Sequence, residues 1–257
     1  MSMQSIWIIA LIASLVAGCA TAPSVDDHPA QIATQPVEFM LSFDDGPLPD
    51  VTERVLDMLA TLNTIDGTPV KAGFFLLSDA KEGFWQHRVT YAPYELWTKG
   101  SITKYPGIAR RIKQEGHTIG NHTAHHPWFR WPWMDTSAAV EADFAKWEAT
   151  STRVLGASSQ RLFRPPYLIL TENVRETANR LGYQIVMGEL VGDGTPNATF
   201  DDILKETESI LQSWNKPYPC VLIFHDNRPT TYKHLTAIVE NLQKQGFILV
   251  DFAPERL

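Results

Sequence analysis

The sequence of 257 residues contains only two cysteines, and they form no CxxC pair. These absences exclude a disulfide-stapled fold and a thiolate zinc site. The chain also lacks an excess of positive charge, because 22 lysines and arginines stand against 29 aspartates and glutamates, giving a net charge of −7. This balance argues against a nucleic-acid-binding protein, which needs a dense cationic surface. With 44% hydrophobic residues, the composition is that of a globular domain with an ordinary core.

The apolar run of residues 6–17 is shorter than the roughly 20 residues that a transmembrane helix needs, and its length is typical of a signal peptide. It ends in Val16-Ala17-Gly18-Cys19, which looks like a bacterial lipobox. We expect a lipoprotein signal peptide over residues 1–18 and a lipid on Cys19 that anchors the chain to a membrane. An ordinary secretory signal is the alternative. Residues 19–36 are small, polar and proline-bearing, which is typical of a tether.

From residue 37 onward, short apolar runs alternate with amphipathic stretches, which predicts a parallel sheet covered by helices. About seven such units predict a single domain over residues 37–257, folded as a distorted (β/α) barrel. The expected strands cover residues 37–43, 71–77, 117–120, 161–163, 184–191, 220–224 and 247–250. The expected helices cover residues 50–62, 105–115, 136–155, 172–181, 200–213 and 231–245, several of them followed by glycine.

Polar residues gather where the expected strands end, and this is the end that carries the chemistry of such barrels. Asp44 and Asp45 follow the first strand. Two adjacent carboxylates at a strand end are costly to bury unless a cation compensates them. The alternative is a solvated turn, because Asp-Asp-Gly is common in turns. His122 and His126 are spaced i, i+4, which places two imidazoles on one side of a helical turn and His125 away from them. Together with Asp45, His122 and His126 form a His₂-carboxylate set, the usual composition of a catalytic zinc site.

Two further polar clusters follow later strands. In Phe163-Arg164-Pro165-Pro166-Tyr167, the prolines fix the backbone, and the arginine beside the paired carboxylates would keep one of them ionised. His225 and Asp226 end the apolar strand of residues 220–224. Taken alone, Arg164 also fits a surface cation before a turn, and His225 also fits a structural histidine.

The order of these clusters resembles the polysaccharide deacetylases, carbohydrate esterase family 4. That family carries runs of the form T-F-D-D-G, H-[ST]-x-x-H, R-P-P-Y, D-x-x-D-W and L-x-H. This chain has SFDDG at 42–46, HTAHH at 122–126, FRPPY at 163–167 and IFH at 223–225, so the resemblance spans about residues 37 to 252. It implies a hydrolase that removes acetyl groups from a polysaccharide or oligosaccharide.

The resemblance also implies a role for each matching residue. Asp45, His122 and His126 would bind a divalent metal, most commonly Zn²⁺, and Asp44 would be the general base. Arg164 would hold Asp44, the backbone N–H of Tyr167 would stabilise the oxyanion, and His225 would be the general acid.

Three departures from the family's runs affect these expectations. Ser42 replaces the first threonine, and Leu168 stands where the family usually has glycine. The fourth run is degraded to GELVGDG at 188–194, without its tryptophan. We expect Asp193 to orient His225 in place of the missing aspartate, with Glu189 as the weaker candidate.

Aromatic residues crowd two segments near the predicted site. Trp128, Trp131 and Trp133 directly follow His126, and residues 82–100 carry Trp85, Tyr91, Tyr94 and Trp97. Indole rings pack against the apolar faces of sugars, so we expect the first three to bind the acetylated glycan. The alternative is that these rings pack their loops onto the barrel.

The leading hypothesis is therefore a deacetylase of a glycan such as chitooligosaccharide or peptidoglycan, acting on N-acetyl or O-acetyl groups. We place it at the bacterial cell envelope, facing the periplasm or the exterior. The alternatives are a related metal-dependent hydrolase of small non-sugar amides, and an inactive glycan-binding lipoprotein.

Overall fold

The computed structural model describes residues 36–79, 100–157, 160–195 and 197–257. The expected signal peptide, Cys19 and the rest of the tether up to residue 35 lie outside the described residues, as do Trp85, Tyr91, Tyr94 and Trp97. Within the described ranges, no helix is both long enough and apolar enough to cross a membrane.

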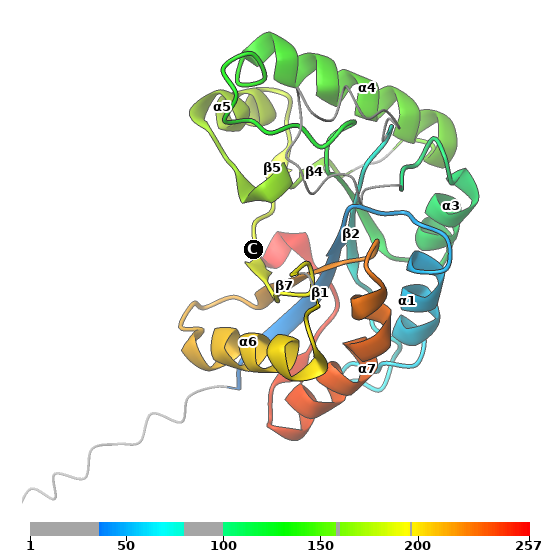
Figure 1. The fold of residues 1–257 in the computed structure, drawn as a ribbon, viewed down its shortest axis with the longest axis vertical. Helices are drawn as coiled ribbons and strands as arrows, with labels where there is room; N and C mark the ends of the chain where they lie inside the picture. Colours follow the sequence, from blue (N-terminus) through cyan, green and yellow to red (C-terminus); the bar gives the residue numbers. More distant parts are fainter. Residues whose placement is uncertain (1–35, 80–99, 158–159, 196) are drawn as a thin grey trace, which may run out of the picture. The chain divides into compact units, whose positions relative to one another are not determined.

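Parallel strands form one curled sheet with helices around its outside (Figure 1). Their order is β5-β4-β3-β2-β1-β7-β6, and β8 also pairs with β1. Each neighbouring pair of these strands is parallel, and the two end strands β5 and β6 leave the curl open on one side. This open, half-closed barrel confirms the expected distorted (β/α) barrel. The strands are β1 (Glu38–Asp44), β2 (Gly73–Leu76), β3 (Thr118–Asn121), β4 (Leu162–Phe163), β5 (Gln184–Ile185), β6 (Glu189–Leu190), β7 (Cys220–His225) and β8 (Ile248–Leu249).

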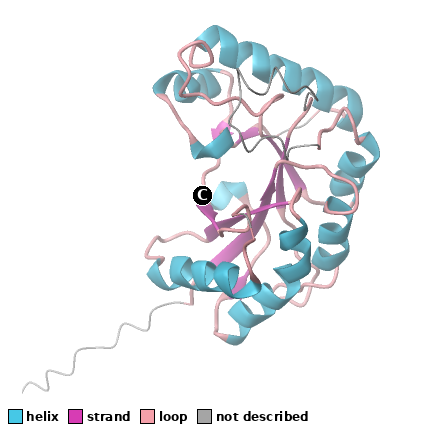
Figure 2. Cartoon of the chain, viewed as in Figure 1, coloured by secondary structure: helices cyan, strands magenta, loops and turns pink. Residues whose placement is uncertain are grey.

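Helices follow most of the strands along the chain, although β5 leads directly to β6. The helices lie around the strands (Figure 2). They are α1 (Thr52–Leu59), α3 (Pro106–Gln114), α4 (Ser137–Leu155), α5 (Glu172–Arg180), α6 (Phe200–Ser213) and α7 (Pro229–Lys244). Three of them begin behind a threonine whose hydroxyl accepts a backbone N–H of the first turn: Thr136, Thr171 and Thr199. Proline at the first helical position starts α3 and α7.

The central strand β1 is buried on both of its faces, so its residues are almost continuously apolar. The ring of Phe43 stacks on Phe74 of β2 with centroids 5.0 Å apart, and it lies 6.0 Å from Phe224 of β7. Burying one such side chain contributes roughly 1.5–3 kcal/mol. Cys220, at the start of β7, is buried and free, and burial raises the pKa of its thiol to about 12.

The prediction of one strand over residues 184–191 is wrong. The segment makes two short strands, β5 and β6, which pair with β4 and β7 at opposite edges of the sheet. Gly188 lies between them, and a Cβ there would come within 2.6 Å of the carbonyl oxygen of Val221. An apolar run has the same appearance whether it pairs continuously or crosses from one edge to the other, so the pattern did not reveal the break.

Candidate active site

The carboxyl ends of β1 and β7 lie side by side, with Asp44 and His225 as register partners. Asp44 is the last residue of β1, and Asp45 follows it with φ 76, in the left-handed region. This change of backbone direction sends two adjacent carboxylates to different partners. Glycine is required next, because a Cβ on Gly46 would lie 2.0 Å from the carboxylate of Asp226.

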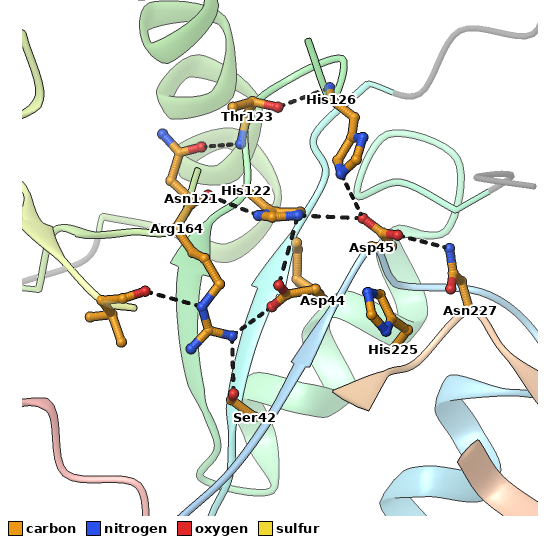
Figure 3. Close-up of polar contacts among 12 residues, drawn as sticks. Ser42, Asp44, Asp45, Asn121, His122, Thr123, His126, Arg164, His225 and Asn227 are labelled. Atoms are coloured by element: carbon orange, nitrogen blue, oxygen red, sulfur yellow. Dashed lines mark hydrogen bonds and ion pairs between the residues drawn. The ribbon is translucent and has the colours of Figure 1, made fainter. Parts of the chain in front are cut away.

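Asp45, His122 and His126 converge on one point (Figure 3). Oδ1 of Asp45 lies 3.2 Å from Nε2 of His126 and 3.4 Å from Nε2 of His122. All three residues are buried, and this carboxylate oxygen has no hydrogen-bond partner. Burial alone would raise the pKa of Asp45, but the facing imidazoles of His126 and His122 outweigh it and hold the pKa well below its usual value.

This donor set fits a divalent metal ion. An ionised carboxylate oxygen that is buried without a hydrogen bond is costly unless a cation faces it. One carboxylate and two imidazoles also make the three-ligand set that catalytic zinc sites use, with a position left for water. Asp45, His122 and His126 are therefore the described residues that could hold a metal.

The expected helical turn at His122 and His126 is wrong, although both imidazoles do reach the site. Residues 122–128 are irregular, and Thr123 (φ 76) and His126 (φ 55) both adopt the left-handed conformation. The side chain of Asn121 accepts the backbone N–H of Thr123 at 2.6 Å, and the hydroxyl of Thr123 accepts that of His126 at 2.8 Å. These two bonds replace the hydrogen bonds of a helix and turn both rings inward.

Two more contacts fix this loop and its rings. Asp143 of α4 accepts the backbone N–H of Ala124 at 2.7 Å. Nδ1 of His122 lies 2.8 Å from the backbone carbonyl of Arg164. Because a carbonyl can only accept, Nδ1 carries the proton and Nε2 presents its lone pair to the metal position. His125 points away, as expected, with its Nδ1 2.6 Å from the carbonyl of Asp79.

Arg164 is fully buried beneath Asp44. Its Nη1 donates to Oδ1 of Asp44 at 2.7 Å and to Oγ of Ser42 at 3.0 Å, and its Nε donates to the carbonyl of Val186 at 3.0 Å. Burial lowers the pKa of Arg164, and the charge of Asp44 opposes that change. The ring of Phe75 covers the guanidinium at 3.9 Å. The predicted contact between Arg164 and Asp44 is present.

Asp193 lies against His225. Of the two residues expected to orient this histidine, Asp193 and Glu189, Asp193 is the one that contacts it. Nδ1 of His225 lies 2.8 Å from Oδ1 of Asp193, and the backbone N–H of His225 donates to Oδ2 at 2.7 Å. The hydroxyl of Thr231 also donates to Oδ2, at 2.5 Å. Burial alone would lower the pKa of His225, but the charge and hydrogen bond of Asp193 outweigh it and raise the pKa to about 9.

A row of aromatic rings leads away from His126. Tyr167, with φ 57, places its ring 4.6 Å from the imidazole, and the ring of Trp128 lies 4.9 Å beyond it. Trp131 and Trp133 form an edge-to-face pair with centroids 4.6 Å apart, and Trp133 is 56% exposed. Leu168, which replaces the family's glycine, also adopts a left-handed backbone, with φ 54.

The structure adds polar residues that the sequence reasoning did not assign to the site. Nδ2 of Asn227 donates to Oδ2 of Asp45 at 3.3 Å, and the hydroxyl of Thr52 donates to Oδ2 of Asp226 at 2.8 Å. Burial, aided by the charges of Asp45 and Asp44, raises the pKa of Asp226 to about 7. The available signal was position, because Asp226 and Asn227 directly follow His225 at a strand end.

Comparison with known proteins agrees with this geometry. A sequence profile described as polysaccharide deacetylase matches residues 31–186. The chain belongs to the polysaccharide deacetylase family. Among related polysaccharide deacetylases, a peptidoglycan-N-acetylglucosamine deacetylase of Bacillus cereus is 33% identical over 212 residues, which cover 80% of this chain and 61% of that protein. A chitin deacetylase of Pestalotiopsis sp is 29% identical over 188 residues, or 68% of this chain and 52% of that one.

The fold comparison agrees with the sequence comparison. The crystal structure of the Bc1960 peptidoglycan N-acetylglucosamine deacetylase matches with a TM-score of 0.65 and 25% identity, covering 87% of this chain and 89% of that one. The present chain thus spans only about half to three fifths of the length of the two relatives named above, but nearly the whole of this solved structure.

Proposed function

We propose that this chain is a metal-dependent carbohydrate deacetylase that hydrolyses acetyl groups on a glycan such as peptidoglycan or chitooligosaccharide. The observation that carries the proposal is the unpartnered, buried oxygen of Asp45 facing two imidazoles, with the ion pair of Asp44 and Arg164 beside it. The names of the relatives support the glycan and the acetyl group as the substrate class.

The proposed metal, most commonly Zn²⁺ in this family, would be held by Asp45, His122 and His126. When bound there, a divalent cation lowers the pKa of a coordinated water and polarises the acetyl carbonyl. Asp44 accepts the proton of the attacking water. It is suited to this because its Oδ1 is bound to Arg164, while its Oδ2 points toward the metal site, 3.9 Å from Nε2 of His122.

His225 and Tyr167 complete the proposed mechanism. The ring of His225 is held through Nδ1 by Asp193, so its Nε2 is the atom that delivers a proton to the leaving amine or alcohol. Because Asp193 raises the pKa of His225 to about 9, the ring carries that proton at neutral pH. The backbone N–H of Tyr167 is the proposed donor to the developing oxyanion.

The tryptophans beyond His126 are the proposed glycan-binding surface. The exposed face of Trp133 and its partner Trp131 provide apolar area suited to a sugar ring. Trp128 is connected to the metal position, because it contacts Tyr167, which in turn contacts His126. We therefore assign the sugar adjacent to the scissile group to Trp128 and more distant sugars to the pair of Trp131 and Trp133.

The proposed location is the outer side of a bacterial membrane, through a lipid on Cys19. This proposal depends on the lipobox-like sequence alone. Mass spectrometry of the chain purified from membranes tests it: a diacylglycerol adduct on an N-terminal Cys19 is expected, and a cleaved, unmodified N-terminus would contradict it.

The decisive experiment measures bound metal and acetate release together. The substrates are chitooligosaccharide, peptidoglycan and acetylated xylan, which also separates N-deacetylation from O-deacetylation. About one zinc-class ion per chain is expected, together with acetate release that a chelator abolishes. Acetate from a small amide but from none of the glycans would favour the alternative hydrolase. Metal binding or glycan binding without any hydrolysis would favour the inactive glycan-binding protein.

Asp44→Asn tests the proposed general base. The variant retains its metal ligands, so metal content should be unchanged while kcat falls by about 10²–10⁴-fold. Asp50→Asn is the matched control, because it makes the same chemical change at an exposed residue outside the site. Full activity in Asp44→Asn would remove Asp44 as the base.

A further inference from the structure

We propose that Asn227 is a positioning residue that presents a single oxygen of Asp45 to the metal ion. The inference rests on the proposed metal site and adds to it a residue that fixes the orientation of one ligand. Asn227 lies two residues beyond His225, in the segment that connects β7 to α7.

The two oxygens of Asp45 have different surroundings. Oδ2 accepts a hydrogen bond from Nδ2 of Asn227 at 3.3 Å, whereas Oδ1 has no hydrogen-bond partner and faces the two imidazoles (Figure 3). With Oδ2 already engaged, Oδ1 is the oxygen left for a cation. A carboxylate without such a neighbour can turn about its last torsion and bind a metal through both oxygens.

The segment that carries Asn227 is itself held firmly. Asn227 is only 4% exposed, and the backbone N–H of the preceding Asp226 donates to the carbonyl of Asp44 at 3.2 Å. The amide of Asn227 therefore meets Asp45 from a fixed position, which is what orienting a metal ligand requires.

The chemical nature of the donor also matters. Asp44 is bound by the guanidinium of Arg164, whose positive charge balances that carboxylate. Asp45 is bound by a neutral amide, so its negative charge remains available to the cation. Two adjacent carboxylates thus receive different partners, one suited to a base and the other to a metal ligand.

Asn227→Leu tests the inference, because leucine has a similar volume but no donor. Thr52→Val is the matched control: it removes a hydrogen bond to the side chain of Asp226 in the same segment, but the backbone bond from Asp226 to Asp44 and the contact between Asn227 and Asp45 remain. The full chain is used for both variants. Zinc affinity is measured by competition with a chelator, the visible spectrum is recorded after loading with Co²⁺, and unfolding of the metal-free chain is followed in urea.

Asn227→Leu should lower zinc affinity by about 10- to 100-fold. Its cobalt spectrum should weaken, because a second oxygen of Asp45 raises the coordination number. Thr52→Val should lower the unfolding midpoint but keep the wild-type cobalt spectrum. Unchanged affinity and spectrum in Asn227→Leu would overturn the inference, and so would equal changes in Thr52→Val. A wild-type chain that binds neither cation would instead contradict the proposed function itself.

Discussion

Replacing Asp193 by asparagine should change how activity depends on pH, and not only how large it is. The carboxylate of Asp193 is the main cause that raises the pKa of His225, from 6.5 to about 9, against the opposing effect of burial. Asparagine keeps the size and one hydrogen-bonding oxygen but removes the charge. The pKa of His225 should therefore fall to its ordinary value or below it in the variant, because burial then acts with less opposition.

The size of the effect follows from proton occupancy of His225. A general acid must be protonated to act, so activity should decline as pH rises through its pKa. With a pKa of about 9, the ring is about 90% protonated at pH 8, whereas with a pKa of 6.5 it is about 3% protonated. The variant should thus lose at least about 30-fold at pH 8 from this cause, and far less at pH 6.

The assay is kcat/KM for acetate release between pH 5.5 and 9.5, expressed at each pH as the ratio of variant to wild type. The ratio removes the loss of activity at low pH that both proteins share, because the hydrogen bonds of Asp193 go to His225 and Thr231 and not to the residues proposed to bind the metal. Glu189→Gln is the matched control: it removes the same charge from the other candidate, which lies in β6. A loss of equal size at pH 6 and pH 8 would refute the proton-donor role, and a shifted profile in Glu189→Gln would refute the assignment to Asp193.

Two further predictions concern stability. Arg164→Met should lower the free energy of unfolding in urea by about 3–5 kcal/mol, because it leaves the buried Asp44 without its cation. Adding Asp44→Asn to this variant should recover part of the loss. No recovery would mean that the loss comes from other contacts of the arginine. Burial, followed by the charge of Lys71, lowers the pKa of His117 to about 4, so its contribution to stability is fully present above pH 6.5 and is lost as pH falls toward 4. His117→Gln should flatten the fall in stability between pH 6.5 and 4, measured on the metal-free chain, and an unchanged slope would contradict this explanation.

The helices could be predicted well because their ends are local. The expected helix over 136–155 is observed as α4 (Ser137–Leu155), and the one over 200–213 as α6 (Phe200–Ser213). Thr136 caps α4 with its own hydroxyl, and Thr199 forms a capping box with Asp202. Such interactions span three residues, so they can be read directly from the sequence.

The loops around the site were harder to predict because non-local contacts shape them. The spacing of His122 and His126 predicted a helical turn, yet the backbone there is set by side chains of Asn121 and Thr123. The contact of Asn227 with Asp45 joins residues 182 positions apart, and it exists only because β1 and β7 are neighbours. A single sequence contains those residues but not the strand order that brings them together.

The pairing of β1 with β7 explains why the base and the acid could be expected at one site. Their register places Asp44 opposite His225, and it continues beyond the strands through the hydrogen bond from Asp226 to Asp44. Asp45 and Asn227, the next residues toward the site, then meet across the same gap. One strand pair therefore positions the proposed base, acid, metal ligand and orienting amide. Inserting a single residue into β7 would turn the side chains beyond it to the opposite faces and separate His225 and Asn227 from Asp44 and Asp45, whereas an insertion at the far end of α7 would leave them in place.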